Sequence, residues 1–140
     1  MTKKIFLTSS DTAIGFISKD AKSLDSAKNR VPNKKYIQAI PDLKSIKKRV
    51  PKKHRKLVRR AKKTTFVLDS NYSFRVVHDK RHNLLLKRLG WAYTTSANRS
   101  GMRYEYSYAC SKADIIIYPL KNSKPSTILK LGKSKLQRLR

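Results

Sequence analysis

Acidic residues are scarce in this chain of 140 residues. It has 8 Asp and Glu against 35 Lys and Arg, a formal net charge of +27, and Glu105 is its single glutamate. Such an excess of positive charge repels itself in the compact state and attracts polyanions. Nucleic acid, meaning tRNA or another RNA, is the partner class we expect, because neutralisation of phosphates by Lys and Arg dominates that affinity. The alternative is that the charge serves solubility alone.

Cysteine and long apolar runs are also scarce. Cys110 is the single cysteine, which excludes a disulfide framework and a cysteine zinc cluster. No apolar run approaches the ~20 residues of a membrane helix. Ile5–Leu7 is too short for the core of a signal peptide and reads better as a strand. We therefore expect a protein of the reducing cytoplasm, with no membrane contact and one domain over residues 1–140.

Short β-prone runs alternate with short helical patterns along the chain, which predicts a mixed α/β domain. The expected strands are 4–7, 36–40, 64–68, 74–77, 91–94, 126–131 and a buried strand at 113–118, while 13–17 fits a strand or a helix. The expected helices are 23–27, one that opens at Pro41-Asp42, one from Pro51 to about Lys62, and 83–89, which ends at Gly90.

Positive charge is concentrated in residues 44–63, which hold 12 Lys or Arg and no acid. On two helices, apolar residues such as Ile46, Leu57 and Val58 would face inward and the bases outward. An ordinary solvated face is the simpler interpretation, but this one lacks the i,i+4 partners that usually compensate a charged helix face. The residues for which we expect RNA contact are Lys47, Lys48, Arg49, Lys52, Lys53, Arg55, Lys56, Arg59 and Arg60.

Three tyrosines at alternate positions, Tyr104, Tyr106 and Tyr108, follow the basic residue Arg103. On a strand, such side chains can stack unpaired bases. The alternative is that they pack at an edge of the sheet or against the polar loop that precedes them. The sequence leaves both interpretations open.

Histidine spacing does not predict a metal site. His78 and His82 are four residues apart, but the residues between them look like a loop, and no cysteine joins them. His54 lies within the basic segment. We expect no protein-bound metal from these residues.

The run Thr94–Gly101 (TTSANRSG, here the SAN loop) is dense in hydroxyls, amide and glycine, as in a turn around a polar or anionic ligand. Lys28 and Arg30 stand two residues apart, so on an extended loop they would project to the same side. A point charge beside a planar fork suits a triphosphate or pyrophosphate. Ser96 and Asn98 are also two residues apart, so their hydroxyl and amide groups would likewise project to one side. Each residue alone also fits ordinary turn or surface chemistry.

Taken in order, the segments SSDTAIG, KNRV, FRVV, TTSANRSG and PSTI resemble the YrdC-type domain of threonylcarbamoyl-AMP synthases. The resemblance runs from about Leu7 to Leu131. Ser9, Val31 and Val77 stand where that family has proline. The resemblance implies an α/β fold with a twisted open mixed sheet, flanking helices and a basic concave face.

The resemblance also implies an activity. ATP, L-threonine and bicarbonate would give threonylcarbamoyl-adenylate and pyrophosphate, for threonylcarbamoyladenosine modification of tRNA alongside other tRNA-modification proteins. Magnesium would bridge the phosphates, with Asp11 the one carboxylate near the site. The alternatives are a non-catalytic RNA-binding member of the same fold, and a basic ribosome-associated protein with no nucleotide site.

The residue roles follow from the same resemblance. Lys28 and Arg30 would stabilise charge on the departing pyrophosphate, and no protein nucleophile is needed. The ATP-binding residues would be Lys28, Arg30, Ser96, Asn98 and a late arginine, for which Arg138 or Arg140 stands. The threonine-binding residues would be Ser10, Arg75 and Ser126.

Overall fold

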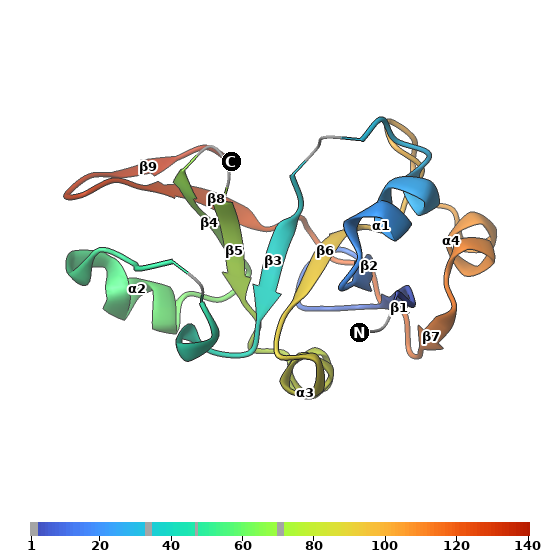
Figure 1. The fold of residues 1–140 in the computed structure, drawn as a ribbon, viewed down its shortest axis with the longest axis horizontal. Helices are drawn as coiled ribbons and strands as arrows, with labels where there is room; N and C mark the ends of the chain where they lie inside the picture. Colours follow the sequence, from blue (N-terminus) through green and yellow to red (C-terminus); the bar gives the residue numbers. More distant parts are fainter. Residues whose placement is uncertain (1–2, 33–34, 47, 70–71) are drawn as a thin grey trace.

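The computed structural model describes residues 3–32, 35–46, 48–69 and 72–140. Within them, nine strands form one open sheet in the order β7-β1-β2-β6-β3-β5-β4-β8-β9, with four α-helices around it (Figure 1). The strands are β1 Phe6–Thr8, β2 Gly15–Ser18, β3 Ile37–Ile40, β4 Thr64–Asp69, β5 Tyr72–Val76, β6 Ala92–Ser96, β7 Ile115–Ile117, β8 Thr127–Leu131 and β9 Leu136–Arg138. The helices are α1 Ala21–Lys28, α2 Arg55–Arg60, α3 Lys80–Leu89 and α4 Tyr106–Lys112, with short 3-10 turns at Leu43–Ser45 and Lys52–His54. None of the helices in these described ranges is long and apolar enough to span a membrane.

The sheet is mixed, as expected from the sequence. β3 lies at its centre, antiparallel to β6 and parallel to β5. The register pairs Gly15 of β2 with Ser96 of β6, and Ile37 of β3 with Thr94 of β6. The start of β2, the start of β3 and the end of β6 therefore meet at one place, where the predicted ligand-binding loops emerge.

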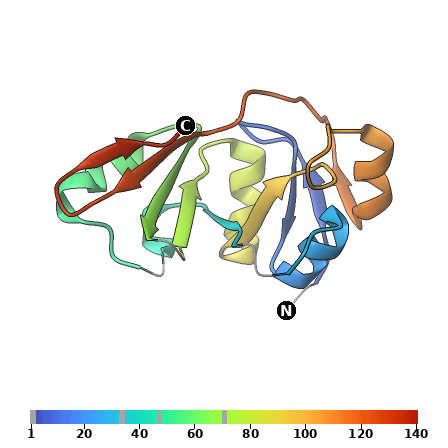
Figure 2. The same ribbon diagram turned by 90° about the horizontal axis from the view of Figure 1, so that it is seen from above.

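Three apolar clusters pack between the sheet and its helices. In Figure 2 these helices follow the length of the sheet, with α2 (green) at the left, α3 (yellow) in the middle, and α1 (blue) and α4 (orange) at the right. The first lies around α1 and α4 and includes Phe16 and Leu24. The second joins α2 to β3, β4 and β5 through residues such as Val58 and Phe74. The third holds α3 through Leu86. Because consecutive strand residues point to opposite faces, one strand can serve two clusters: in β2, Phe16 belongs to the first cluster and Ile17 to the third.

The basic segment is less helical than predicted. The helix expected at Pro41-Asp42 is a single 3-10 turn at Leu43–Ser45. The Asp42 side chain caps the Ser45 amide at 3.1 Å, as it would in a longer helix, but Ile46 is already extended at ψ 138°, so the helix does not continue. The next helix runs only from Arg55 to Arg60 after a 3-10 turn. Leu57, predicted to face inward, is 38% exposed. His54 is buried instead, with its Nε2 3.0 Å from the Gly132 carbonyl oxygen.

Two segments in the second half of the chain differ from the sequence-based interpretation. Tyr106 and Tyr108 lie on helix α4, so the base-stacking interpretation loses the strand that it assumed. The 113–118 strand, predicted to be buried, is the edge strand β7, where Ile115 is 36% exposed and the following Tyr118 is 57% exposed. An apolar run cannot reveal which strand lies at the edge of a sheet, because that depends on pairing between distant segments.

Candidate functional site

A cavity of about 270 Å³, here the central cavity, opens where β2, β3 and β6 meet. Its walls include Gly15, Tyr36 and the strand residues Thr94–Ser96. Among the described residues that line it are four cations and no carboxylate: Arg30, Lys35, Arg75 and Arg140. Cations with no lining acid make this cavity a candidate site for an anionic ligand.

Arg75 is the most deeply buried of these cations. It comes from β5, is 6% exposed, and its Nη1 donates a hydrogen bond of 2.8 Å to Thr12 Oγ1. Its Nε is buried and has no hydrogen-bond partner among the described residues. Burial lowers the pKa of this guanidinium, Arg140 lowers it further, and Asp11 opposes both. The side chain is therefore a desolvated cation with an unused donor beside the cavity.

Ser10 reaches Arg75 only through Thr12. The hydroxyls of Ser10 and Thr12 are 3.0 Å apart, and the Thr12 amide donates to Ser10 Oγ at 3.1 Å. Thr12 lines the central cavity, whereas Ser10 lines a neighbouring cavity beside Asp79. The sequence directed attention to Ser10 and missed Thr12, although its hydroxyl two residues further along the same loop was the available signal.

Lys28 was predicted to project from an extended loop on the same side as Arg30. The structure places it elsewhere. It is the last residue of α1, and Asn29 follows in the left-handed region at φ 48°. Its side chain is 1% exposed and its Nζ donates to the carbonyl oxygens of Ser96 and Asn98, each at 2.9 Å. Lys28 therefore makes a buried contact that joins the SAN loop to α1, and it is not among the residues that line the central cavity.

The SAN loop is held by its own side chains as well. Asn98 Nδ2 donates to the carbonyl oxygens of Arg99 and Met102 at 2.9 and 2.8 Å, and the Ser100 amide donates to the Lys28 carbonyl oxygen at 2.9 Å. Ser96 lines the central cavity, whereas Asn98 is not among its lining residues. The loop thus presents Ser96 to the cavity from a fixed backbone.

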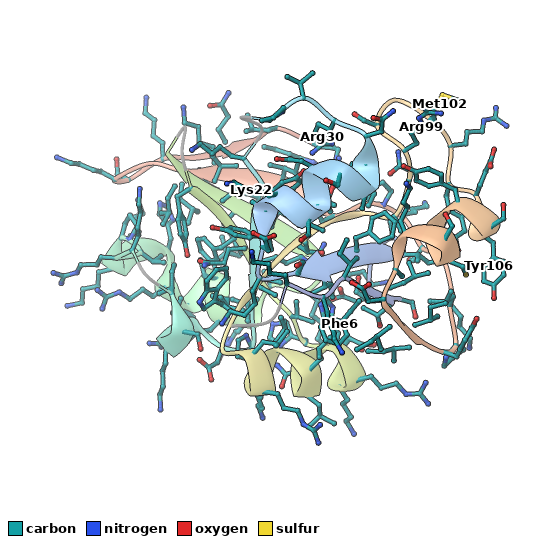
Figure 3. The ribbon with its side chains drawn as sticks, turned by 45° about the vertical axis from the view of Figure 1, so that its right-hand side comes forward. Phe6, Lys22, Arg30, Arg99, Met102 and Tyr106 are labelled. Carbon is teal, nitrogen blue, oxygen red and sulfur yellow. The ribbon has the colours of Figure 1, made fainter. Side chains whose placement is uncertain are left out.

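Arg30 lies at the cavity mouth beside Tyr36. Its guanidinium carbon is 5.3 Å from the centre of the Tyr36 ring, and its Nε has no hydrogen-bond partner in the described part of the chain. Figure 3 shows Arg30 beyond the end of α1, with Arg99 of the SAN loop and Met102, which follows that loop, on the same side of the molecule. Tyr36 donates to Asp25 Oδ1 at 2.5 Å, and burial, then that carboxylate, raises the pKa of Tyr36 to about 12. Arg30 is thus positioned by an aromatic ring and not by an acid.

Ser126 also lines the central cavity. Its hydroxyl lies 2.7 Å from Thr65 Oγ1, and both residues are buried. Arg140 Nε donates to the Ser126 carbonyl oxygen at 2.9 Å and lines the cavity. Arg138 is exposed on β9 and is not among the lining residues. Of the two late arginines, the structure therefore places Arg140 at the cavity.

The predicted RNA-binding residues divide into two groups. Lys48, Arg49, Arg55 and Arg59 line a second cavity of about 560 Å³, here the basic cavity. The others that the structure describes are exposed beside it: Lys52, Lys53, Lys56 and Arg60. Lys47 lies outside the described residues.

Metal-ligating side chains do not converge. No group of three or more His, Cys, Asp or Glu residues lies close enough to hold a metal ion in the described ranges. His78 precedes α3, whose cap is Asp79, while His82 is buried within the helix. Asp79-Lys80-Arg81, predicted to be a loop, forms this helix start. The two histidines therefore do not share a helix face.

Comparison with known proteins gives the fold its context. The chain is similar to solved structures of P. abyssi Sua5 complexed with L-threonine, with a TM-score of 0.82 at 19% identity, and of E. coli YciO, with a TM-score of 0.78 at 15% identity. Both similarities cover 99% of this chain, but only 50% of the Sua5 chain and 82% of YciO. The chain has the YrdC-type fold. The fold class expected from the sequence is confirmed.

Sequence comparison alone is less informative. No family model matches the chain. It is 36% identical over 92 residues to the "Uncharacterized protein MG259 homolog" of Mycoplasma pneumoniae, which covers 64% of this chain and 20% of that protein. The chain with the YrdC-type fold thus spans about a fifth of that relative and half of Sua5.

Proposed function

We propose that the central cavity binds L-threonine and a nucleotide, with Arg75 receiving the threonine carboxylate. The observation that carries the proposal is the guanidinium of Arg75, 6% exposed, in a cavity whose described lining residues include no carboxylate. A buried cation is costly unless paired, and a carboxylate accepts parallel hydrogen bonds from a guanidinium. P. abyssi Sua5, which has the same fold, has been solved with L-threonine.

The reaction we propose is synthesis of threonylcarbamoyl-adenylate. The threonine amine attacks the carbon of bicarbonate, a C–O bond of bicarbonate breaks, and the products are a carbamate and water. A carbamate oxygen attacks the α-phosphorus of ATP, and the bond from that phosphorus to the pyrophosphate oxygen breaks. The protein contributes positioning and charge stabilisation, so it needs no nucleophile. The adenylate would serve tRNA modification in the cytoplasm, together with other tRNA-modification proteins.

The residues divide this work by position. Pockets that enclose drug-sized ligands measure roughly 300–1,000 Å³. The central cavity, at about 270 Å³, is smaller and suits an amino acid, with the nucleotide extending past its mouth. Arg30 and Lys35 would meet the phosphates there, and Ser96 offers a hydroxyl. Lys28 acts through the SAN loop, because its ammonium already binds the loop carbonyls.

Magnesium enters this proposal only as the counter-ion of ATP. Mg²⁺ is usually held by one or two carboxylates together with phosphates. The described residues lining the central cavity include no carboxylate, so they do not form a dedicated site. Asp11 is the nearby acid, and its charge acts on Arg75. No step above depends on a protein-bound ion.

The test is threonine binding by calorimetry, followed by pyrophosphate release with ATP, bicarbonate and magnesium. Arg75→Gln should weaken threonine binding at least about tenfold, because charge-assisted hydrogen bonds contribute about 1.5–3 kcal/mol each. Arg88→Gln is the matched control, since Arg88 is exposed on α3. Equal threonine affinity in wild type and Arg75→Gln would exclude Arg75 as the carboxylate site. Threonine binding without pyrophosphate release would leave a binding protein and exclude the reaction.

A second candidate function is RNA binding without catalysis. It is favoured by the net charge of +27 and by the exposed bases around α2. Contact with several phosphates releases counterions, so affinity should fall steeply with salt. RNA binding and catalysis are compatible, since an enzyme that supplies tRNA modification can also hold RNA.

A further inference from the structure

The basic cavity lies on the opposite side of β5 from the central cavity. Arg75 and Val76 are neighbours on this strand, and consecutive strand side chains point to opposite faces. Arg75 lines the central cavity, and Val76 lines the basic cavity. A ligand in one cavity therefore leaves the other accessible.

The floor of the basic cavity is apolar. Val50 and Val76 are 3% and 4% exposed, and Leu43 and Ile46 pack against the same cluster. All four line the cavity. A site for phosphate alone has no use for such a floor, whereas a flat heterocycle gains free energy by burying its faces against apolar groups.

The remaining residues that line the basic cavity are mostly cationic. Arg49, Arg55 and Arg59 contribute three guanidinium groups, and Arg55 Nε donates to the Val50 carbonyl oxygen at 3.2 Å. Asp42 is the one acid among the described lining residues, and its carboxylate already caps Ser45 through the amide at 3.1 Å and the hydroxyl at 3.0 Å. Guanidinium planes both stack on unpaired bases and bind phosphates.

We propose that the basic cavity holds one unstacked nucleotide of a bound RNA, with its base against the apolar floor and its flanking phosphates on the arginine rim. The volume of about 560 Å³ is within the range of pockets for ligands of this size. His78, exposed at the cavity edge, offers ring nitrogens to the base. This inference rests on the second candidate function, RNA binding, and is independent of catalysis at Arg75.

The shape of the cavity favours RNA over a membrane. Surface helices that bind lipid present protruding apolar side chains to the acyl region. Here Val50 and Val76 are buried, whereas Arg49 and Arg59, which line the same cavity, are exposed. Three arginines around a recessed floor match a base flanked by phosphates.

The experiment compares two RNA hairpins that differ by one bulged 2-aminopurine nucleotide. Fluorescence anisotropy measures affinity, and 2-aminopurine emission, which rises on unstacking, reports the state of the base. The wild-type chain should prefer the bulged hairpin about tenfold, because contact to one base contributes 1–3 kcal/mol, on the order of tenfold or more in affinity. Emission should increase on binding.

Two variants separate the floor from the charge. Ile46→Trp fills the cavity and should abolish the preference for the bulge without changing the salt dependence. Arg59→Gln should reduce the preference, whereas Arg60→Gln, next to it on α2 but outside the cavity lining, should weaken both hairpins equally. Arg59 is exposed, so its variant tests the proposal even if Ile46→Trp unfolds.

Several outcomes would overturn the proposal. Equal affinity for both hairpins would do so, as would an unchanged preference in Arg59→Gln. Equally damaging would be tighter binding to free AMP, to poly-glutamate or to anionic phosphatidylglycerol vesicles than to the bulged RNA. If the wild-type chain binds neither hairpin, the RNA-binding function itself is excluded. If it binds both hairpins equally, only the proposed nucleotide site is excluded. Threonine binding, measured in parallel, should be the same in all variants.

Discussion

The Lys28 ammonium lies 2.9 Å from the Asn98 carbonyl oxygen and 3.2 Å from Asn98 Oδ1. These two residues, 70 positions apart, join the end of α1 to the SAN loop. The sequence grouped them as phosphate ligands. In the structure, each is a partner of the other, so their first role is to fix the loop from which Ser96 reaches the cavity.

Lys28→Met should destabilise the fold. The variant keeps the length of the side chain but leaves the carbonyl oxygens of Ser96 and Asn98 without their charged donor. Unsatisfied buried acceptors cost about 1–3 kcal/mol, so the free energy of unfolding should fall by about 2–3 kcal/mol in urea titration. The control is Lys22→Met, exposed on the same helix, which should change it by less than about 0.5 kcal/mol. Similar losses in both variants would contradict the role of Lys28.

Thr12→Val should weaken threonine binding without unfolding the protein. The substitution is nearly isosteric but removes the hydroxyl that accepts from Arg75 Nη1 at 2.8 Å. One hydrogen bond contributes about 1 kcal/mol, so affinity measured by calorimetry should fall by about fivefold. Thr8→Val is the control, because Thr8 is also buried but lies outside the central cavity. Unchanged affinity in Thr12→Val would show that Arg75 does not need this hydroxyl.

Stability should decrease with falling pH because of His82. Both ring nitrogens are buried without partners in the described part of the chain, and burial, with Arg75, lowers the pKa of His82 to about 4 while Asp79 opposes the shift. The unfolded state, with a pKa near 6.5, binds the proton first. Stability contributed by the neutral ring is therefore complete above about pH 6.5 and is lost towards pH 4, by about 3 kcal/mol.

The measurement is the free energy of unfolding of wild type and His82→Leu across this pH range. Carboxylates that titrate at low pH contribute to both proteins, so the difference between the two curves isolates the histidine. That difference should change between pH 6.5 and 4. Parallel curves would mean that His82 titrates normally in the folded protein.

Gly15→Ala should disturb the junction of β2 and β6. A Cβ at this position would lie 2.9 Å from the Thr95 carbonyl oxygen, so the backbone must move. Overpacking of this kind costs about 1–3 kcal/mol, and because Gly15 and Thr95 line the central cavity, threonine affinity should fall too. In Gly132→Ala the nearest atom would be at 3.3 Å, so the melting temperature should decrease less. A larger effect at Gly132 would refute this reading of the junction.

RNA affinity should depend strongly on salt. The logarithm of the association constant should fall linearly with the logarithm of salt concentration, by about 0.7 per phosphate contacted on a single strand. Arg60→Gln should reduce the slope by about one contact, since Arg60 is exposed on α2. A flat response in wild type would exclude phosphate contact as the basis of binding.

The sequence by itself determined much of the fold and part of the residue set that lines the central cavity. Alternation of short strands and helices predicted a mixed α/β domain, because local patterning is carried by neighbouring residues. The YrdC-type fold was expected from the resemblance of the ordered motifs to that family. The resemblance also indicated Arg75 and Ser126, which the structure places at one cavity.

Only the tertiary structure decided what each of these residues touches. Lys28 is buried and donates a hydrogen bond to the SAN loop. Arg140, and not Arg138, lines the central cavity. The Thr12 hydroxyl contacts both Ser10 and Arg75. Such contacts join segments tens of residues apart, and burial of a charge depends on which segments meet. The two cavities on opposite sides of β5 exist for the same reason: they form only where strands and loops from distant parts of the chain converge.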